Sequence, residues 1–202
     1  MSALADRLKQ TLVELDQELD RAIAEQARAF RYEVKRRKVV FQREVRARHL
    51  AARVRLGTFL KAARPMVILT APVIYGLVVP FLLLDLCVTV YQTLCFPVYR
   101  IDKVRRGDYI AFDHRHLAYL NALQKLNCLY CSYCNGLISY IREIAARTEQ
   151  YWCPIKHATR LKGSHERYPD FVDFGDAEGF QTRSSDLRRA LRADGLSRRP
   201  KR

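Results

Sequence analysis

The stretch between residues 66 and 99 restricts the folds open to this 202-residue chain more than any other feature. Residues 67–84 carry no charged side chain and neither do residues 86–99, so Asp85 is the only acid or base in the stretch. One membrane crossing needs about 20 apolar residues. The stretch is therefore too long for one straight helix and too short for two ordinary ones. We predict a membrane-associated element within an all-α fold.

Proline and glycine positions favour a kinked helical hairpin for this element. Pro72 and Pro80 each remove a backbone donor, and Gly76 lies between them, so we expect a bend there. Both flanks are basic, which places both on the cytoplasmic side of the membrane. Two short arms that enter the membrane and return satisfy these observations. A single tilted span over residues 73–96 and a buried soluble hairpin are the alternatives.

Asp85 also favours a shallow element. A carboxylate at the bilayer centre costs about 2.5–3.5 kcal/mol on insertion scales. A shallow hairpin avoids most of this cost by holding Asp85 at the level of the lipid headgroups.

Charge divides the chain into segments. There are 36 Lys and Arg against 21 Asp and Glu, for a net charge of +15. Residues 31–64 alone hold twelve basic and two acidic side chains, whereas residues 1–30 are slightly acidic. We predict four segments: an amphipathic and basic helix (1–64), a membrane-embedded hairpin (65–99), a cytoplasmic helical body (100–182) and a flexible basic tail (183–202).

The basic segment indicates an anionic partner, and lipid is favoured over nucleic acid. Lys and Arg beside an apolar run attract anionic lipid at about 1 kcal/mol per charge. The nearby aromatic residues Phe30, Tyr32 and Phe41 form no stacking platform, and no zinc-finger, helix-turn-helix or RNA-binding signature is present. The residues we predict to contact lipid are Arg36, Arg37, Lys38, Arg46 and Arg53.

The N-terminal region predicts a long amphipathic helix. Its apolar residues recur at spacings of 4, 3, 4 and 4, and a weaker stripe continues as far as Val45. They are Leu8, Leu12, Leu15, Leu19 and Ile23, followed by Ala27, Phe30, Val34, Phe41 and Val45. A helix over residues 3–60 would reach about 85 Å, so it must break or find a partner. Packing on its own chain and a homo-oligomeric coiled coil both stay open.

Cysteine and histidine residues in the C-terminal body predict a metal site. Thiolates with an imidazole suit zinc or iron, and Cys3His is an established structural zinc set. The predicted ligands are Cys128, Cys131, Cys153 and His157. An iron–sulfur cluster fits less well, because Cys153 lies 19 positions after Cys134. The alternative is that the cysteines serve only as small core residues.

Two chain paths lead to different sites. In one straight helix, Cys131 and Cys153 would lie about 33 Å apart and could not share an ion. A reversal at Asn135-Gly136 would instead favour two sites, one near the turn and one near the open end. A second chain could also complete a shared site. Four further residues are candidate ligands, or partners that hydrogen-bond the ligands: Glu143, Glu149, His114 and His116.

Two strings in this region resemble a known group of proteins. NCLYCSYCNG (residues 127–136) and RTEQYWCPIKHA (residues 147–158) resemble the two motifs of an uncharacterised family of bacterial membrane-associated proteins. The resemblance covers about residues 66–175 and implies a bacterial inner membrane, with no activity attached. Cys134 departs from the family pattern, which has only the first two cysteines, and is therefore left out of the predicted ligand set.

Two classes of function follow. The first is a membrane-anchored metal-binding protein with a Cys/His site, and the second is a non-enzymatic membrane scaffold that uses its basic helix and tail for recruitment. The sequence has no nucleophile elbow, phosphate loop or dinucleotide fingerprint, and whether the chain is an enzyme stays open. We expect both termini in the cytoplasm.

Overall fold

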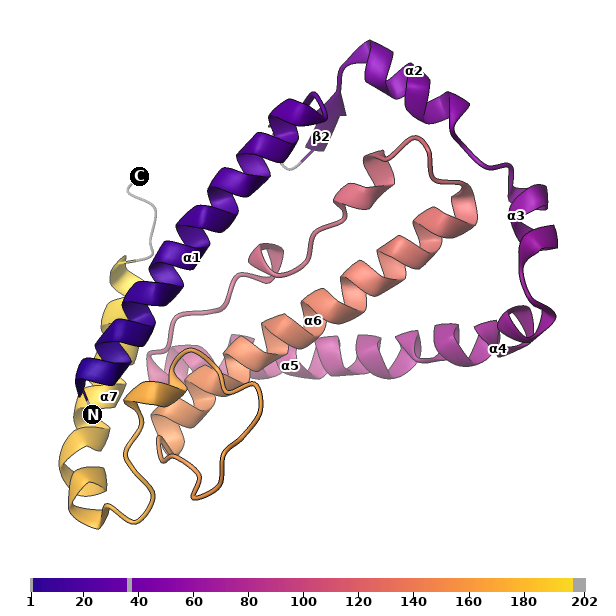
Figure 1. Cartoon of the computed structure of the whole chain (residues 1–202). Helices are drawn as coiled ribbons and strands as arrows, with labels where there is room; N and C mark the ends of the chain where they lie inside the picture. The colour runs from indigo at the N-terminus through magenta and orange to yellow at the C-terminus, as the bar shows by residue number, and fades with distance from the viewer. Residues whose placement is uncertain (1, 36–37, 198–202) are drawn as a thin grey trace. The chain divides into compact units, whose positions relative to one another are not determined.

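The computed structural model describes residues 2–35 and 38–197. Among them it shows a mainly α-helical chain with one two-stranded hairpin (Figure 1). The chain forms two compact units, one of residues 1–78 and 111–134 and the other of residues 79–110 and 135–202. The apolar segment and a long helix after it each contribute to both units.

The predicted N-terminal helix is shorter than its apolar stripe. Helix α1 covers Ser2–Ala29 and ends in a turn at Arg31, whose φ is +51°. Strands β1 (Tyr32–Lys35) and β2 (Lys38–Phe41) follow and pair antiparallel. Their valine and aromatic residues favour strands, and Tyr32 faces Phe41 with ring centroids 5.5 Å apart. The long N-terminal helix therefore breaks after α1, which is one of the two outcomes that its length allowed.

Short elements complete the first unit. Helices α2 (Arg43–Ala51) and α3 (Leu56–Ala62) lead to the apolar segment, and the 3₁₀ turn η2 (Asp113–His116) precedes α6. Asn121 is buried and caps α6: its Oδ1 accepts from the Gln124 amide at 3.0 Å, while Gln124 Oε1 accepts from the Asn121 amide at 3.0 Å. This reciprocal capping fixes where α6 begins.

The apolar segment forms one long helix instead of a hairpin. Helices α4 (Pro65–Gly76) and α5 (Val78–Tyr99) are separated only at Leu77, whose φ of −62° and ψ of −16° stay in the right-handed helical region. The helix is interrupted at Leu77, close to where we expected a bend, but the predicted reversal of the chain is wrong. The segment Pro65–Tyr99 is long and apolar enough to cross a membrane, with a mean hydropathy of 2.4.

Helix α6 runs without a break over Ala122–Trp152, through the Asn135-Gly136 dipeptide. The alternative in which the chain reverses there is wrong. Gly136 serves close packing instead of a turn, because a Cβ at this position would lie 2.6 Å from the carbonyl oxygen of Tyr109. The helix ends just before Cys153-Pro154, as proline predicts.

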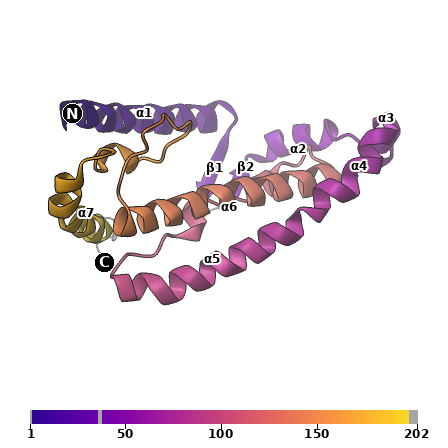
Figure 2. The same cartoon turned by 90° about the horizontal axis from the view of Figure 1, so that it is seen from below.

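In the second unit, α5 lies against α6, as Figures 1 and 2 show, and the loops around them fill the core. The short turns η1 (Arg106–Asp108) and η3 (Tyr168–Asp170) belong to these loops, and a parallel bridge joins Ile155 to Val172. The buried core residues include Phe96, Ile101, Val104, Ile110, Leu137, Tyr140, Ile144, Phe171 and Val172.

The basic C-terminal segment is largely a packed helix. Helix α7 covers Ala177–Ser197 and buries Ser184, Leu187 and Leu191, which recur at helical spacing. Gln150 Nε2 donates to the carbonyl of Leu187 at 2.8 Å. The predicted flexible tail is therefore helical up to residue 197, and residues 198–202 lie outside the described part of the chain.

Candidate functional site

The four predicted metal ligands fall into two pairs. Cys128 and Cys131 lie on α6 within the first unit, half-buried and exposed respectively. Cys153 follows the end of α6 and His157 lies in the next loop, both exposed in the second unit. All six cysteines of the chain are thiols outside any disulfide.

Helix continuity keeps these pairs apart within one chain. Cys153 lies 22 positions after Cys131, and an unbroken helix rises about 33 Å over that distance. Among residues 2–35 and 38–197, no three His, Cys, Asp or Glu side chains form a group that could hold a metal ion. Cys134 is buried in the core. The metal site stays a prediction that would need a second chain.

Glu143 belongs to a buried network of ion pairs. Its Oε1 accepts from Arg147 Nε at 2.7 Å and from Arg167 Nη2 at 3.1 Å. The two arginines also donate to protein oxygens, Arg147 to the carbonyl of Asp102 at 2.6 Å and Arg167 to Gln150 Oε1 at 3.0 Å. The network joins α6 to the loops on either side of it.

The electrostatics of this network keep Glu143 ionised. Burial raises the pKa of Glu143, but the hydrogen bond from Arg147 and the charges of Arg167 and Arg147 outweigh burial, so its pKa is lowered overall. The guanidinium groups of Arg147 and Arg167 already donate hydrogen bonds to this carboxylate. Glu143 therefore holds the fold together through these contacts.

Glu149, another predicted candidate, pairs with a histidine that no sequence pattern had singled out. Glu149 Oε2 lies 2.9 Å from His165 Nε2, while His165 Nδ1 is buried with no hydrogen-bond partner in the described structure. Because a carboxylate oxygen accepts, His165 Nε2 is the donor of this pair. The ring packs against Phe171, with centroids 5.3 Å apart.

The remaining predicted residues lie on surfaces. His114 Nδ1 is 3.2 Å from Ser132 Oγ, and His116 accepts from Arg115 Nε at 3.3 Å. Among the predicted lipid contacts, three are exposed: Lys38, Arg46 and Arg53. The other two, Arg36 and Arg37, lie outside the described residues.

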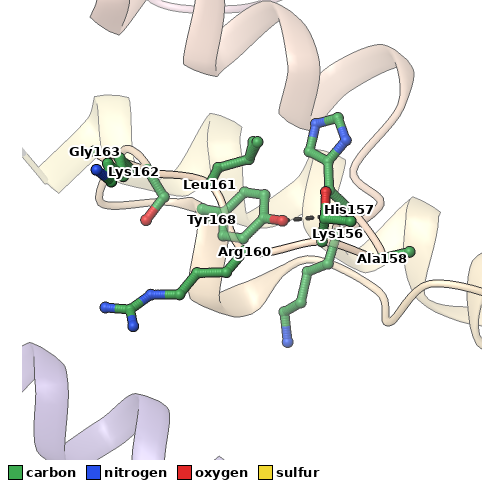
Figure 3. Close-up of a pocket in the computed structure, with 10 residues that line it drawn as sticks. Lys156, His157, Ala158, Arg160, Leu161, Lys162, Gly163 and Tyr168 are labelled. Carbon is green, nitrogen blue, oxygen red and sulfur yellow. Dashed lines mark hydrogen bonds between the residues drawn. The ribbon is translucent and has the colours of Figure 1, made fainter.

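A basic loop encloses an open hollow of about 600 Å³, lined by residues 156–164 and Tyr168. Tyr168 Oη accepts from the His157 amide at 2.7 Å, and Arg142 donates to the carbonyls of Gly163 and Ser164. Figure 3 shows the side chains of Lys156 and Arg160 extending away from Tyr168. The hollow thus gathers positive charge without a convergent set of side chains.

One side of α4 and α5 exposes large apolar side chains. Nine apolar side chains between 48 and 76% exposed recur there mostly at helical spacing, and we call them the outer face. They are Met66, Leu69, Val73, Val79, Leu83, Leu86, Val90, Leu94 and Val98.

Half-buried or buried residues of the same helix form the opposite side, which we call the inner face. They recur at spacings of three or four. We define this face by Ala71, Tyr75, Val78, Phe81, Asp85, Val88, Gln92, Phe96 and Tyr99; Tyr91 and Cys95 beside it are also half-buried.

Comparisons of the chain with protein-family models, curated proteins and solved structures find no match.

Proposed function

We propose that this chain is a membrane-attached scaffold, held on anionic lipid by α4 and α5 and joined to a second copy through α1. The outer face carries this proposal. A contiguous apolar surface of several hundred Å² on a soluble body marks an interface with protein or membrane. Here the surface extends along a helix of 35 residues in which Asp85 is the single charged side chain.

The charges beside the outer face support lipid as its partner. Residues 31–64, which precede α4, carry twelve basic side chains, and the described ones among the predicted lipid contacts are exposed. Each such charge contributes about 1 kcal/mol near an anionic surface. We assign the protein to the cytoplasmic side of a bacterial inner membrane on this basis and on the resemblance of its two motifs.

Helix α1 supports the scaffold role. Its residues Leu12, Leu15, Leu19 and Ile23 lie at helical spacing, and each side chain is about half exposed. An isolated helix with such a stripe is only marginally stable in water. The 4-3-4 spacing of Leu8, Leu12, Leu15 and Leu19 is typical of a coiled coil, so we propose a second α1 as the partner.

Vesicle flotation tests the attachment. The wild-type protein should float with phosphatidylglycerol vesicles and much less with phosphatidylcholine vesicles. The double variant Leu83→Lys/Leu86→Lys should lose most of this binding, because two charges enter the outer face. Leu161→Lys, the same change on an exposed loop leucine, should bind like wild type. Wild-type protein that stays unbound on both vesicle types would refute the proposal.

Metal binding is a second candidate, and one observation favours it. Cys131, Cys153 and His157 are all exposed, so a second chain can reach them. A second chain joined through α1 could bring Cys128 and Cys131 of one copy to Cys153 and His157 of the other. We propose zinc or iron as the metal, with zinc favoured in a site closed entirely by protein ligands.

A further inference from the structure

We infer that α4 and α5 lie in the plane of the membrane surface, with the outer face in lipid, instead of crossing the bilayer. The inference rests on the proposed membrane attachment and specifies its geometry. Polar protein contacts the helix at Tyr75 in the first unit and at Asp85 and Gln92 in the second.

In the first unit, polar and charged groups meet the helix around Tyr75. Tyr130 Oη donates to the carbonyl of Ile74 at 2.9 Å, and Tyr75 Oη donates to Asn127 Oδ1. Ser132, on the same turn of α6 as Tyr130, binds His114 of η2. The four residues of η2, Asp-His-Arg-His, thus attach to α6 at the level where it contacts α4.

In the second unit, the contacts to the inner face are again polar. Asp85 forms an ion pair with Arg106, and its side chain is 13% exposed. Gln92 is buried: its Nε2 donates to Tyr140 Oη at 2.8 Å, and its Oε1 accepts from the Val104 amide at 2.6 Å. The buried network of Glu143 begins one turn of α6 beyond Tyr140.

Length decides between the two geometries. A crossing occupies about 20 residues. Every stretch of 20 residues within Pro65–Tyr99 includes either Tyr75 or Gln92. A crossing in any register would therefore draw polar protein into the hydrocarbon, including irregular backbone from the loop after α5. Lipid-exposed irregular backbone is not tolerated there.

A helix that lies in the plane of the membrane surface keeps the polar protein and the irregular backbone out of the hydrocarbon. The outer face extends from Met66 to Val98, about 48 Å along the helix, and can sink about 5–10 Å into the lipid as a whole. Tyr99, Tyr151 and Trp152 cluster where α5 ends, with Tyr99 and Tyr151 stacked 5.0 Å apart, and such residues favour the headgroup level. Asp85 keeps its ion pair on the polar side.

Depth-dependent tryptophan quenching tests the inference. Trp152, the single tryptophan of the chain, is replaced by Phe, and Leu69→Trp, Leu83→Trp or Val98→Trp is added singly on the outer face. Each full-length variant is bound to phosphatidylglycerol vesicles that contain lipids brominated near or far from the headgroup. Circular dichroism verifies helix content, and Leu86→Trp replaces any variant that fails to fold.

The in-plane geometry predicts one shallow depth for all three tryptophans. A crossing helix would separate neighbouring positions by up to about 20 Å in depth, since they are 14 or 15 residues apart. One deep and two shallow tryptophans would overturn the in-plane inference and leave membrane attachment intact. Protein that does not bind the vesicles at all would overturn both.

Discussion

At the scale of single residues, the most informative group is the carboxylate of Glu143. It is half-buried, yet its pKa is lowered because Arg147 and Arg167 lie against it. Removing one partner from a buried ion pair leaves an uncompensated charge, which costs more than the pair contributes. The integrity of the second unit should therefore depend on this side chain.

We predict that Glu143→Gln lowers the free energy of unfolding by about 3 kcal/mol, because two buried guanidinium groups lose their counter-charge. Thermal unfolding of the full chain in detergent, followed by circular dichroism, measures the change. Asp186→Asn is the matched control. It removes an exposed ion pair with Arg189 and should leave the unfolding temperature unchanged. Equal effects of the two substitutions would refute the structural role of Glu143.

The same carboxylate predicts a pH dependence. Because the pKa of Glu143 is lower in the folded chain than its ordinary value of 4.5, its contribution is complete above about pH 4.5. The contribution is lost as the pH falls through the lowered pKa. The stability difference between wild type and Glu143→Gln should therefore shrink on acidification below pH 4.5. A constant difference down to pH 2 would contradict this linkage.

At the scale of elements, the close approach of α6 to the preceding loop depends on Gly136. A Cβ there would lie 2.6 Å from Tyr109 O and 3.0 Å from the Cα of Ile110, so backbone would have to move. Alanine is the better helix former by about 1 kcal/mol. A loss of stability on Gly136→Ala would therefore come from the close contact and not from helix propensity.

We predict that Gly136→Ala destabilises the protein despite its higher helix propensity. Gly57→Ala is the control, because Gly57 is also helical and a Cβ added there would meet no atom within 4 Å; it should stabilise by about 0.5–1 kcal/mol. Opposite shifts of the unfolding temperature confirm the close contact. A stabilising Gly136→Ala would show that α6 does not pack on Tyr109 in this way.

Sequence patterns predicted those elements that are determined by residues close together in the sequence. The apolar segment and the interruption of its helix near Gly76 both follow from neighbouring residues. The break of the N-terminal helix depends on pairing between Tyr32 and Phe41, nine residues apart, and helical spacing concealed it. Gly136 resembled a turn residue because its contact with Tyr109 is distant in the sequence.

The candidate site was predictable only in part, for the same reason. Glu143 and Glu149 were selected from the sequence, but their partners were not. Arg167 lies 24 residues from Glu143, and His165 lies 16 residues from Glu149, so a long loop must fold back before either contact exists. The only local sign of the network was the spacing of four between Glu143 and Arg147.

At the scale of the whole molecule, the scaffold proposal predicts self-association through α1. The double variant Leu15→Glu/Leu19→Glu should be monomeric at concentrations where wild type is dimeric, because charges replace the exposed apolar stripe. Sedimentation in detergent gives the mass of the protein part. Gln17→Glu, on another face of α1, is the control and should dimerise. A monomeric wild type would disprove this partner.

If the predicted ligands are shared between two chains, only the dimer should bind metal. We expect about one zinc or iron per chain in purified wild-type protein, and little in Cys153→Ser or in the monomeric α1 variant. Cys87→Ser, within the apolar helix, should keep its metal. Elemental analysis measures all four proteins. Folded, metal-free wild type would end the metal hypothesis.

The most direct test of the central claim is the side of the membrane on which the two ends lie. An in-plane attachment keeps α1 and α7 on the same side, so reporters fused at Ser2 and Arg202 should both report the cytoplasm in intact bacterial cells. Reporters on opposite sides would show that α4 and α5 cross the bilayer. That result would contradict the account and would place one half of the chain in an oxidising compartment.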